Sequence, residues 1–138
     1  MAQDTRALVQ ALYDAYARGD AERVAALIHD DIDWVMYAPV SVFAFAGPRR
    51  GRDAVMAALA SIASSYALLH YQREVVVVDG DRAAVMADVS FRQHTTGRTL
   101  RFRVANFLRC SDGQVIEFRE FIDTFDVVEQ ALGRELAF

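Results

Sequence analysis

The stretch RAAVMADVSFRQHTTGRTLRFRVANFLRCSDGQVIEFREFIDTF, residues 82–125, decides the fold of this chain. It contains three long runs of strand-forming residues, separated by two tight turns at Thr96-Gly97 and Asp112-Gly113. Asp-Gly between apolar runs is the strongest short-range signal for a β-hairpin. Three consecutive long strands predict a curved antiparallel sheet. The last strand is aromatic and ends in Asp123, where such a sheet can hold one ionisable group in an apolar pocket.

The first half of the chain has the periodicity of helices. Residues 5–18 carry apolar side chains at helical spacing, Gly19 is a helix stop, and Asp20 is an N-cap for a second helix. A third helix follows Gly51. We therefore predict one α+β domain over residues 1–138, in which a cone-shaped antiparallel sheet wraps over N-terminal helices. The remaining predicted elements are a strand at 32–37, an edge strand or flap at 40–46, a loop at 47–51, a strand at 70–78 and a terminal helix at 127–136.

The amino-acid composition and net charge exclude several classes of binding partner. The chain has 138 residues, a net charge of −4 and a pI near 5.3, and it has no run of basic residues. Nucleic acid and anionic membranes are therefore not expected as partners. All 15 cations are arginine, which excludes Schiff-base chemistry on a lysine. No stretch reaches the roughly 18 apolar residues of a spanning helix, and the N-terminal segment does not resemble a signal peptide, so we expect a cytoplasmic protein.

The hairpin at residues 111–114 predicts which side chains share a face of the sheet. If the turn has two residues, Asn106 lies opposite Arg119, and the same face carries Asp123. We assign this face, with Phe102, Val104 and Phe121, to the concave side of the sheet. The opposite face mixes arginines with apolar residues and is predicted to pack on a second subunit; it carries Arg101, Arg103, Phe107, Phe118 and Ile122. A bulge in these strands would invert part of this assignment.

The order of several short motifs resembles the nuclear transport factor 2 fold superfamily, and within it the SnoaL-like polyketide cyclases, ketosteroid isomerases and limonene epoxide hydrolase. The resemblance extends over nearly the whole chain and rests on these segments: 16–20 (YARGD), 29–31 with Trp34, 51–55 (GRDAV), 111–116 (SDGQVI) and 121–123 (FID). It implies a cone-shaped α+β barrel, an apolar cavity open at one end, and a dimer that forms through the sheet.

The resemblance carries over only some catalytic residues. Asp123 matches the final-strand aspartate that is the acid or base of the cyclases and of the epoxide hydrolase. Met36-Tyr37 resembles the hydrolase segment whose tyrosine holds the nucleophilic water. The hydrolase also uses an Arg-x-Asp motif, and the nearest stretch here, Met86-Ala87-Asp88, lacks the arginine. In the ketosteroid isomerases, a base aspartate and a second, protonated aspartate occupy positions that fall here near Met36 and near Ala105 or Asn106. Neither acid is therefore present in this chain.

We predict three catalytic residues, each with a structural alternative. Asp123 is a general acid or base, or else it pairs with an arginine or caps the terminal helix. Asn106 and Arg119 polarise a substrate oxygen, or else Arg119 is held by Glu117 or Asp123 in a structural pair. Ligand contacts are predicted for residues that could otherwise be core: Tyr16, Trp34, Tyr37, Phe102, Val104 and Phe121.

Two functions are consistent with these residues. The first is an enzyme without cofactor that moves a proton on a small apolar carbonyl or epoxide compound, as an isomerase, cyclase, hydratase or dehydratase. The second is a domain of the same fold that binds a hydrophobic ligand, or forms dimers, without catalysis. No metal site is expected, because the three histidines, His29, His70 and His94, are far apart in the sequence. An Asp123 that faces the cavity favours the enzyme, and one that turns outward favours the binding domain.

Overall fold

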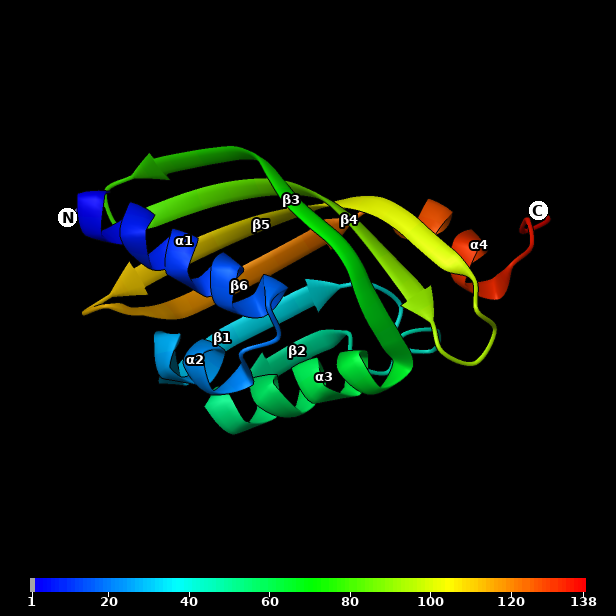
Figure 1. Ribbon diagram of the computed structural model, residues 1–138, viewed down its shortest axis with the longest axis horizontal. Helices are drawn as coiled ribbons and strands as arrows, with labels where there is room; N and C mark the ends of the chain where they lie inside the picture. Colours follow the sequence, from blue (N-terminus) through cyan, green and yellow to red (C-terminus); the bar gives the residue numbers. More distant parts are fainter. Residues whose placement is uncertain (1) are drawn as a thin grey trace.

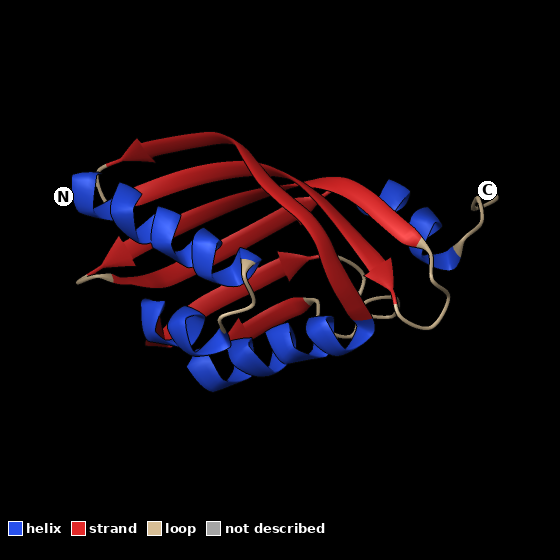
Figure 2. Ribbon diagram, in the orientation of Figure 1, coloured by secondary structure: helices blue, strands red, loops and turns tan. Residues whose placement is uncertain are grey.

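The computed structural model describes residues 2–138 and confirms the α+β class (Figures 1 and 2). Six strands form one curved sheet, with helices α1, α2 and α3 gathered on one side of it and α4 at its far end (Figure 1). The elements are α1 (Ala2–Ala17), α2 (Ala21–Leu27), β1 (Ile28–Tyr37), β2 (Gly47–Arg50), α3 (Arg52–Ser65), β3 (Tyr66–Asp79), β4 (Arg82–Gln93), β5 (Thr99–Ser111), β6 (Gln114–Ile122) and α4 (Thr124–Leu132). Among the described helices, none is long and apolar enough to cross a membrane.

The sheet has the strand order β2-β1-β6-β5-β4-β3 and is not closed into a barrel. All neighbouring strands are antiparallel except β1 and β6, which are parallel. The parallel pair brings the first strand beside the last, so the sheet is mixed and not wholly antiparallel as predicted.

The connection between β1 and β2 corrects two local predictions. Residues 40–46, predicted as an edge strand or a flap, form turns and not a strand, because the carbonyl of Pro39 accepts hydrogen bonds from the backbone N–H groups of Val42 and Phe43. The flap stays a prediction. Phe43 is buried at the centre of this segment and anchors it to the core. The stretch from Gly47 to Arg50, predicted as a loop, is instead strand β2 and pairs with β1.

The helix ends follow from capping residues. Asp20 caps α2, as predicted, by accepting a hydrogen bond from the N–H of Arg23 at 3.0 Å. Asp123 caps α4 by accepting one from the N–H of Asp126 at 3.2 Å. Gly133 has a φ of 70°, a left-handed conformation that ends α4 at Leu132. The terminal helix is therefore shorter at its C-terminal end than predicted, and it begins three residues earlier.

The β5–β6 hairpin contains the bulge that decides the chemistry of the interior. Asp112 and Gly113 both have positive φ and form the predicted two-residue turn, with Ser111 paired to Gln114. Cys110 then pairs with Val115, but Arg109 pairs with Glu117, so Ile116 is an extra residue on β6. Beyond this bulge the two faces of β6 are exchanged relative to the simple register.

Candidate functional site

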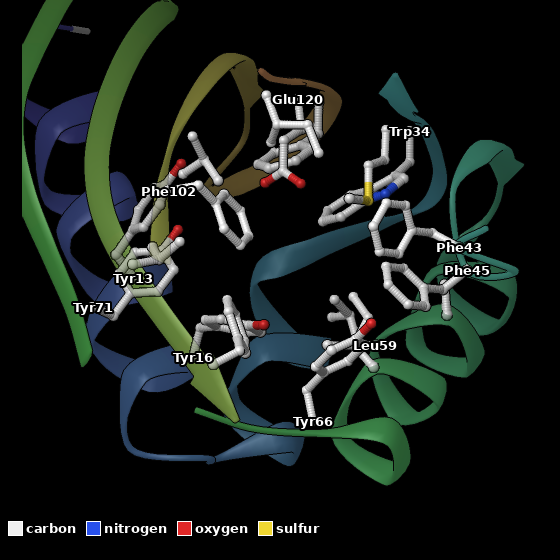
Figure 3. A pocket seen from close by; sticks show the side chains of 18 of the residues that line it. Tyr13, Tyr16, Trp34, Phe43, Phe45, Leu59, Tyr66, Tyr71, Phe102 and Glu120 are labelled. Atoms are coloured by element: carbon white, nitrogen blue, oxygen red, sulfur yellow. The ribbon is translucent and has the colours of Figure 1, made fainter. Parts of the chain in front are cut away.

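An apolar cavity lies between the concave face of the sheet and the helices (Figure 3). Its volume is about 110 Å³, and side chains from α1, α2, α3, every strand except β2, the β1–β2 connection and α4 line it. Aromatic residues form much of its wall: Tyr13, Tyr16, Trp34, Phe43, Phe45, Tyr66, Tyr71, Phe91, Phe102 and Phe118. Among the described lining residues Glu120 is the one acid, and none is Arg, Lys or His. A ligand in this cavity would therefore meet a hydrophobic wall with a single carboxyl group.

Glu120 reaches the cavity because of the bulge in β6. Past Ile116, the inward side chains of β6 are Phe118, Glu120 and Ile122, all of which line the cavity. The carboxyl group of Glu120 points into the open space in Figure 3. Glu120 is half-buried and lines the cavity.

Two consecutive hydrogen bonds, from Tyr13 to Asn106 and from Asn106 to Glu120, position the Glu120 carboxyl group. The Asn106 Nδ2 atom donates to Oε1 of Glu120 at 3.0 Å, and the Tyr13 hydroxyl donates to Oδ1 of Asn106 at 2.5 Å. Asn106 is only 1% exposed and lies directly opposite Glu120 in the β5–β6 pairing. Because Tyr13 occupies the amide oxygen, the amide nitrogen of Asn106 is directed at the carboxyl group. The second carboxyl oxygen has no donor among the described residues.

The surroundings make Glu120 an acid that titrates near neutrality. Burial in the apolar cavity raises the pKa of Glu120 from 4.5 to about 6, and the hydrogen bond from Asn106 opposes part of that rise. Burial, followed by the nearby charge of Glu120, raises the pKa of Tyr13 and of Tyr16 above the usual 10. The same causes, with contributions from neighbouring tyrosines, raise the pKa of Tyr71. These tyrosines therefore stay neutral while Glu120 gains or loses its proton.

Four of the six predicted ligand contacts line the cavity. Tyr16 comes from α1, Trp34 from β1, and Phe102 and Val104 from β5. The faces predicted for β5 are thus correct, since Val104 and Asn106 are both buried on the concave side. Whether these residues bind a ligand stays a prediction.

Tyr37 and Phe121 lie outside the cavity, contrary to prediction. Their rings stack on each other, with centroids 4.6 Å apart, and they are 44% and 46% exposed. Phe121 lies on the convex face because the bulge exchanges the faces of β6, and its parallel pairing with Tyr37 carries that residue to the same side. Phe107, 51% exposed, packs against the edge of Phe121 with ring centroids 5.9 Å apart.

Arg119 and Asp123 also lie outside the cavity. Arg119 is on the convex face and donates to the backbone carbonyl of Asp33 at 2.9 Å and to the Asp33 carboxylate at 3.0 Å. It is thus held in a structural ion pair, but with Asp33 and not with the predicted partners Glu117 or Asp123. Asp123 follows the end of β6 and caps α4, which was the second alternative for this residue. Of the three predicted catalytic residues, only Asn106 contacts the group that lies in the cavity.

Sequence reasoning missed Glu120 because it lay on the face assigned to the exterior. One signal was present: Val115 and Ile116 are adjacent apolar residues, which breaks the alternation that Phe118, Glu120 and Ile122 then follow. A bulge at that break turns these three residues inward together.

A second hollow adjoins the cavity at its open side. Its volume is about 400 Å³, and it shares Tyr16, Leu59 and Tyr66 with the inner cavity. Its rim includes Arg18 and Asp20, which lie between α1 and α2 and form an exposed ion pair at 3.4 Å.

The comparisons with known proteins agree with this architecture. The family model of the SnoaL-like domain matches residues 9–118, so the chain belongs to the SnoaL-like domain family, within the nuclear transport factor 2-like fold. Among solved structures, the chain is similar to a putative isomerase from Rhodopseudomonas palustris. Their identity is 39% and the TM-score is 0.83, over 91% of this chain and 93% of that chain.

Two further structures share the fold at lower identity. A putative polyketide cyclase from Xanthomonas campestris is 24% identical, with a TM-score of 0.77 over 94% of this chain and 98% of that chain. An epoxide hydrolase from M. tuberculosis, of the limonene epoxide hydrolase-like type, is 16% identical, with a TM-score of 0.78 over 96% and 92% of the two chains. No curated protein matches the chain.

Proposed function

We propose that this protein is a proton-transfer enzyme that acts on a small apolar carbonyl or epoxide compound, with Glu120 as its acid–base group. The observation that carries the proposal is the single carboxyl group in an otherwise apolar cavity, with a pKa of about 6. A group that titrates near the working pH can both accept and return a proton efficiently. The similarity to a putative isomerase supports the same class of reaction.

For a carbonyl compound the proposed step is a transfer between carbon and Glu120. The Glu120 carboxylate accepts the proton from a carbon next to the carbonyl group, which leaves an enolate in the cavity and a neutral carboxyl group on Glu120. Return of that proton to the same carbon restores the substrate, and return to another carbon gives an isomer. Asn106 touches the reacting carboxylate, and Tyr13 is a positioning residue that acts through Asn106. The charge on the enolate is accommodated because the transfer neutralises Glu120 at the same time.

The role proposed here for Glu120 replaces the one predicted for Asp123. An outward Asp123 was expected to favour a binding domain without catalysis. Glu120 supplies what Asp123 was predicted to supply, namely a carboxyl group among aromatic residues in the cavity, and this favours the enzyme over the binding domain.

Hydrogen exchange at carbon tests the proposal without knowledge of the natural substrate. A bicyclic ketone such as 2-decalone is incubated with the protein in D2O, and loss of the signals of the protons next to the carbonyl is followed by NMR. We expect exchange above the buffer rate, increasing with pH through about 6 as Glu120 ionises. Glu120→Gln should lower the enzymatic rate by roughly 10²–10⁴-fold.

Two carboxylates outside the cavity are the matched controls. Asp123→Asn keeps a capping oxygen, and Glu117 is paired with Arg82 and Arg109 on the convex face. Both Asp123→Asn and Glu117→Gln should exchange at the native rate. Equal rates in native protein and Glu120→Gln, or a loss confined to Asp123→Asn, would contradict the assignment.

We also propose that the protein is a homodimer that associates through the convex face of the sheet. The support is a cluster of exposed aromatic side chains, Tyr37, Phe107 and Phe121, beside the ion pairs of Arg101 with Asp88 and of Arg103 with Glu74. Exposed apolar patches with a charged border are typical of protein interfaces. Phe118 and Ile122, which were predicted for this surface, face the cavity instead.

A further inference from the structure

Glu120 has no countercharge among the residues that the structure describes. The described lining of the cavity contains no cationic side chain, and Glu120 forms no ion pair within the described residues. Arg73, whose guanidinium lies over the Tyr13 ring at 5.9 Å from its centroid, is bound to Asp14 at 2.7 Å. Asn106 supplies one neutral hydrogen bond to one of the two carboxyl oxygens. Buried charges in proteins are normally paired, so the ionised site is incomplete without a ligand.

The wall around Glu120 is suited to an organic cation. Trp34 and Phe118 are stacked at 3.9 Å, and Trp34, Phe43 and Phe102 flank the cavity near Glu120 in Figure 3. The faces of aromatic rings attract cations, tryptophan most strongly, and this attraction grows when water is excluded. An alkylated ammonium also loses less hydration than an unsubstituted ammonium on entering an apolar cavity, because methyl groups cover its charge.

We propose that this cavity binds a ligand with a quaternary or protonated amine on an apolar body, and that the cation lies beside the Glu120 carboxylate. The apolar body would fill the aromatic-lined space, and the cation would supply the missing countercharge. The carboxylate would repel anionic ligands of the same shape, since the described residues that line the cavity include no arginine or histidine to receive them. This inference concerns binding alone and does not depend on proton transfer to carbon.

Protonation of Glu120 should abolish the preference of the cavity for a cationic ligand over an uncharged one. The titratable groups that interact with Glu120 are Tyr13 and Tyr16 from α1 and Tyr71 from β3, whose pKa values are raised by burial and by Glu120, so all three remain neutral between pH 5 and pH 8. Within that range the charge near the cavity therefore follows Glu120. A quaternary ammonium has no proton to lose, so any pH dependence of its affinity comes from the protein.

A matched pair of ligands tests the inference. Cyclohexyltrimethylammonium and its uncharged isostere tert-butylcyclohexane have nearly the same shape, and both are transparent where tryptophan fluoresces. Trp34 is the only tryptophan of the chain and lines the cavity, so its fluorescence reports binding of either probe. At pH 8 we expect the cation to bind at least about tenfold more tightly than the hydrocarbon. At pH 5 the ratio should fall toward one, and cyclohexanecarboxylate should bind weakly at pH 8.

Variants of Glu120 and Glu117 test the binding of the cation independently of catalysis. Glu120→Gln should remove the preference for the cation while it keeps the affinity for the hydrocarbon, and Glu117→Gln should behave as the native protein. Equal affinity for the two probes at pH 8, or a preference that does not change between pH 8 and pH 5, overturns the inference even if Glu120→Gln fails to fold. A cation preference without any carbon exchange would uphold it and contradict the proposed enzyme.

Discussion

Replacing Glu120 by glutamine should stabilise the protein at pH 8. Glutamine has nearly the same shape, and its carbonyl oxygen can still accept the hydrogen bond from Asn106. What the change removes is an ionisable group that folding takes from water into an apolar cavity. The native protein must bear the cost of that burial whenever Glu120 is ionised, and the variant does not.

The size of this effect follows from the pKa. The folded-state value of about 6 exceeds the usual 4.5, so the folded protein binds more protons than the unfolded chain within that window. The free energy of unfolding therefore decreases as pH rises from about 4.5 to about 6 and stays lower above it. The difference between the two pKa values, at 1.36 kcal/mol per pH unit, corresponds to about 2 kcal/mol. For a chain of this length that is a rise in Tm of roughly 5–8 °C for the variant.

Urea unfolding of the native protein and of Glu120→Gln, at one protein concentration and over a series of pH values, measures the effect. The stability difference should be near 2 kcal/mol at pH 8 and should shrink as pH approaches 4.5. Glu117→Gln, which alters a carboxylate on the convex face, is the control and should not show this pattern. A Glu120→Gln variant that is less stable than the native protein at pH 8, or a difference that does not vary with pH, would refute the reasoning.

Three other predictions concern the surroundings of Glu120 and the convex face. Asn106→Leu removes the one hydrogen bond that opposes the rise in the pKa of Glu120, so the midpoint of carbon exchange should move above pH 6. Tyr13→Phe leaves the buried Oδ1 of Asn106 without its donor and should cost about 1–3 kcal/mol in urea unfolding; an unchanged stability would contradict the hydrogen bond. Phe121→Glu should shift the mass in sedimentation velocity from dimer to monomer, and Val40→Glu, at an exposed loop position, should not; equal masses would remove the proposed interface.

Much of the fold could be predicted because its signals are local. The turn at Asp112-Gly113 requires positive φ at both residues, and Asp-Gly is suited to this conformation. Along β5, Val104 and Asn106 occupy alternate positions without interruption, so the period of two assigned their faces correctly. The order of helices followed from apolar spacing in the same way.

The parallel pairing of β1 with β6 had no local signal. It joins residues near position 35 to residues near position 119, and no turn connects the two strands. Tyr37 was placed in the pocket because this pairing could not be foreseen. The sequence likewise did not show on which face of the sheet Arg119 lies, because its ion pair with Asp33 depends on the pairing of β1 with β6.

One extra residue in β6 explains most of the difference between the predicted and the observed positions of the site residues. The register of β6 was counted from the turn as a continuous period of two, and the extra residue Ile116 changes that count by one. Arg119 and Phe121 therefore moved to the outside, and Glu120 moved to the inside. Asp123 fell beyond the strand, where a helix start needs a capping oxygen.

The extra residue in the last strand also suggests how relatives of this protein can diverge. If β6 paired without the bulge and Ile116 were retained, Ile116 would lie opposite Arg109, and Arg119 would lie opposite Asn106 in place of Glu120. The lining would then carry a guanidinium in place of a carboxylate and would select anions. A change of register by one residue, without any side-chain replacement, is thus a route to the opposite charge preference in this fold, and an alignment of relatives that differ at this bulge would pair residues that face opposite sides of the sheet.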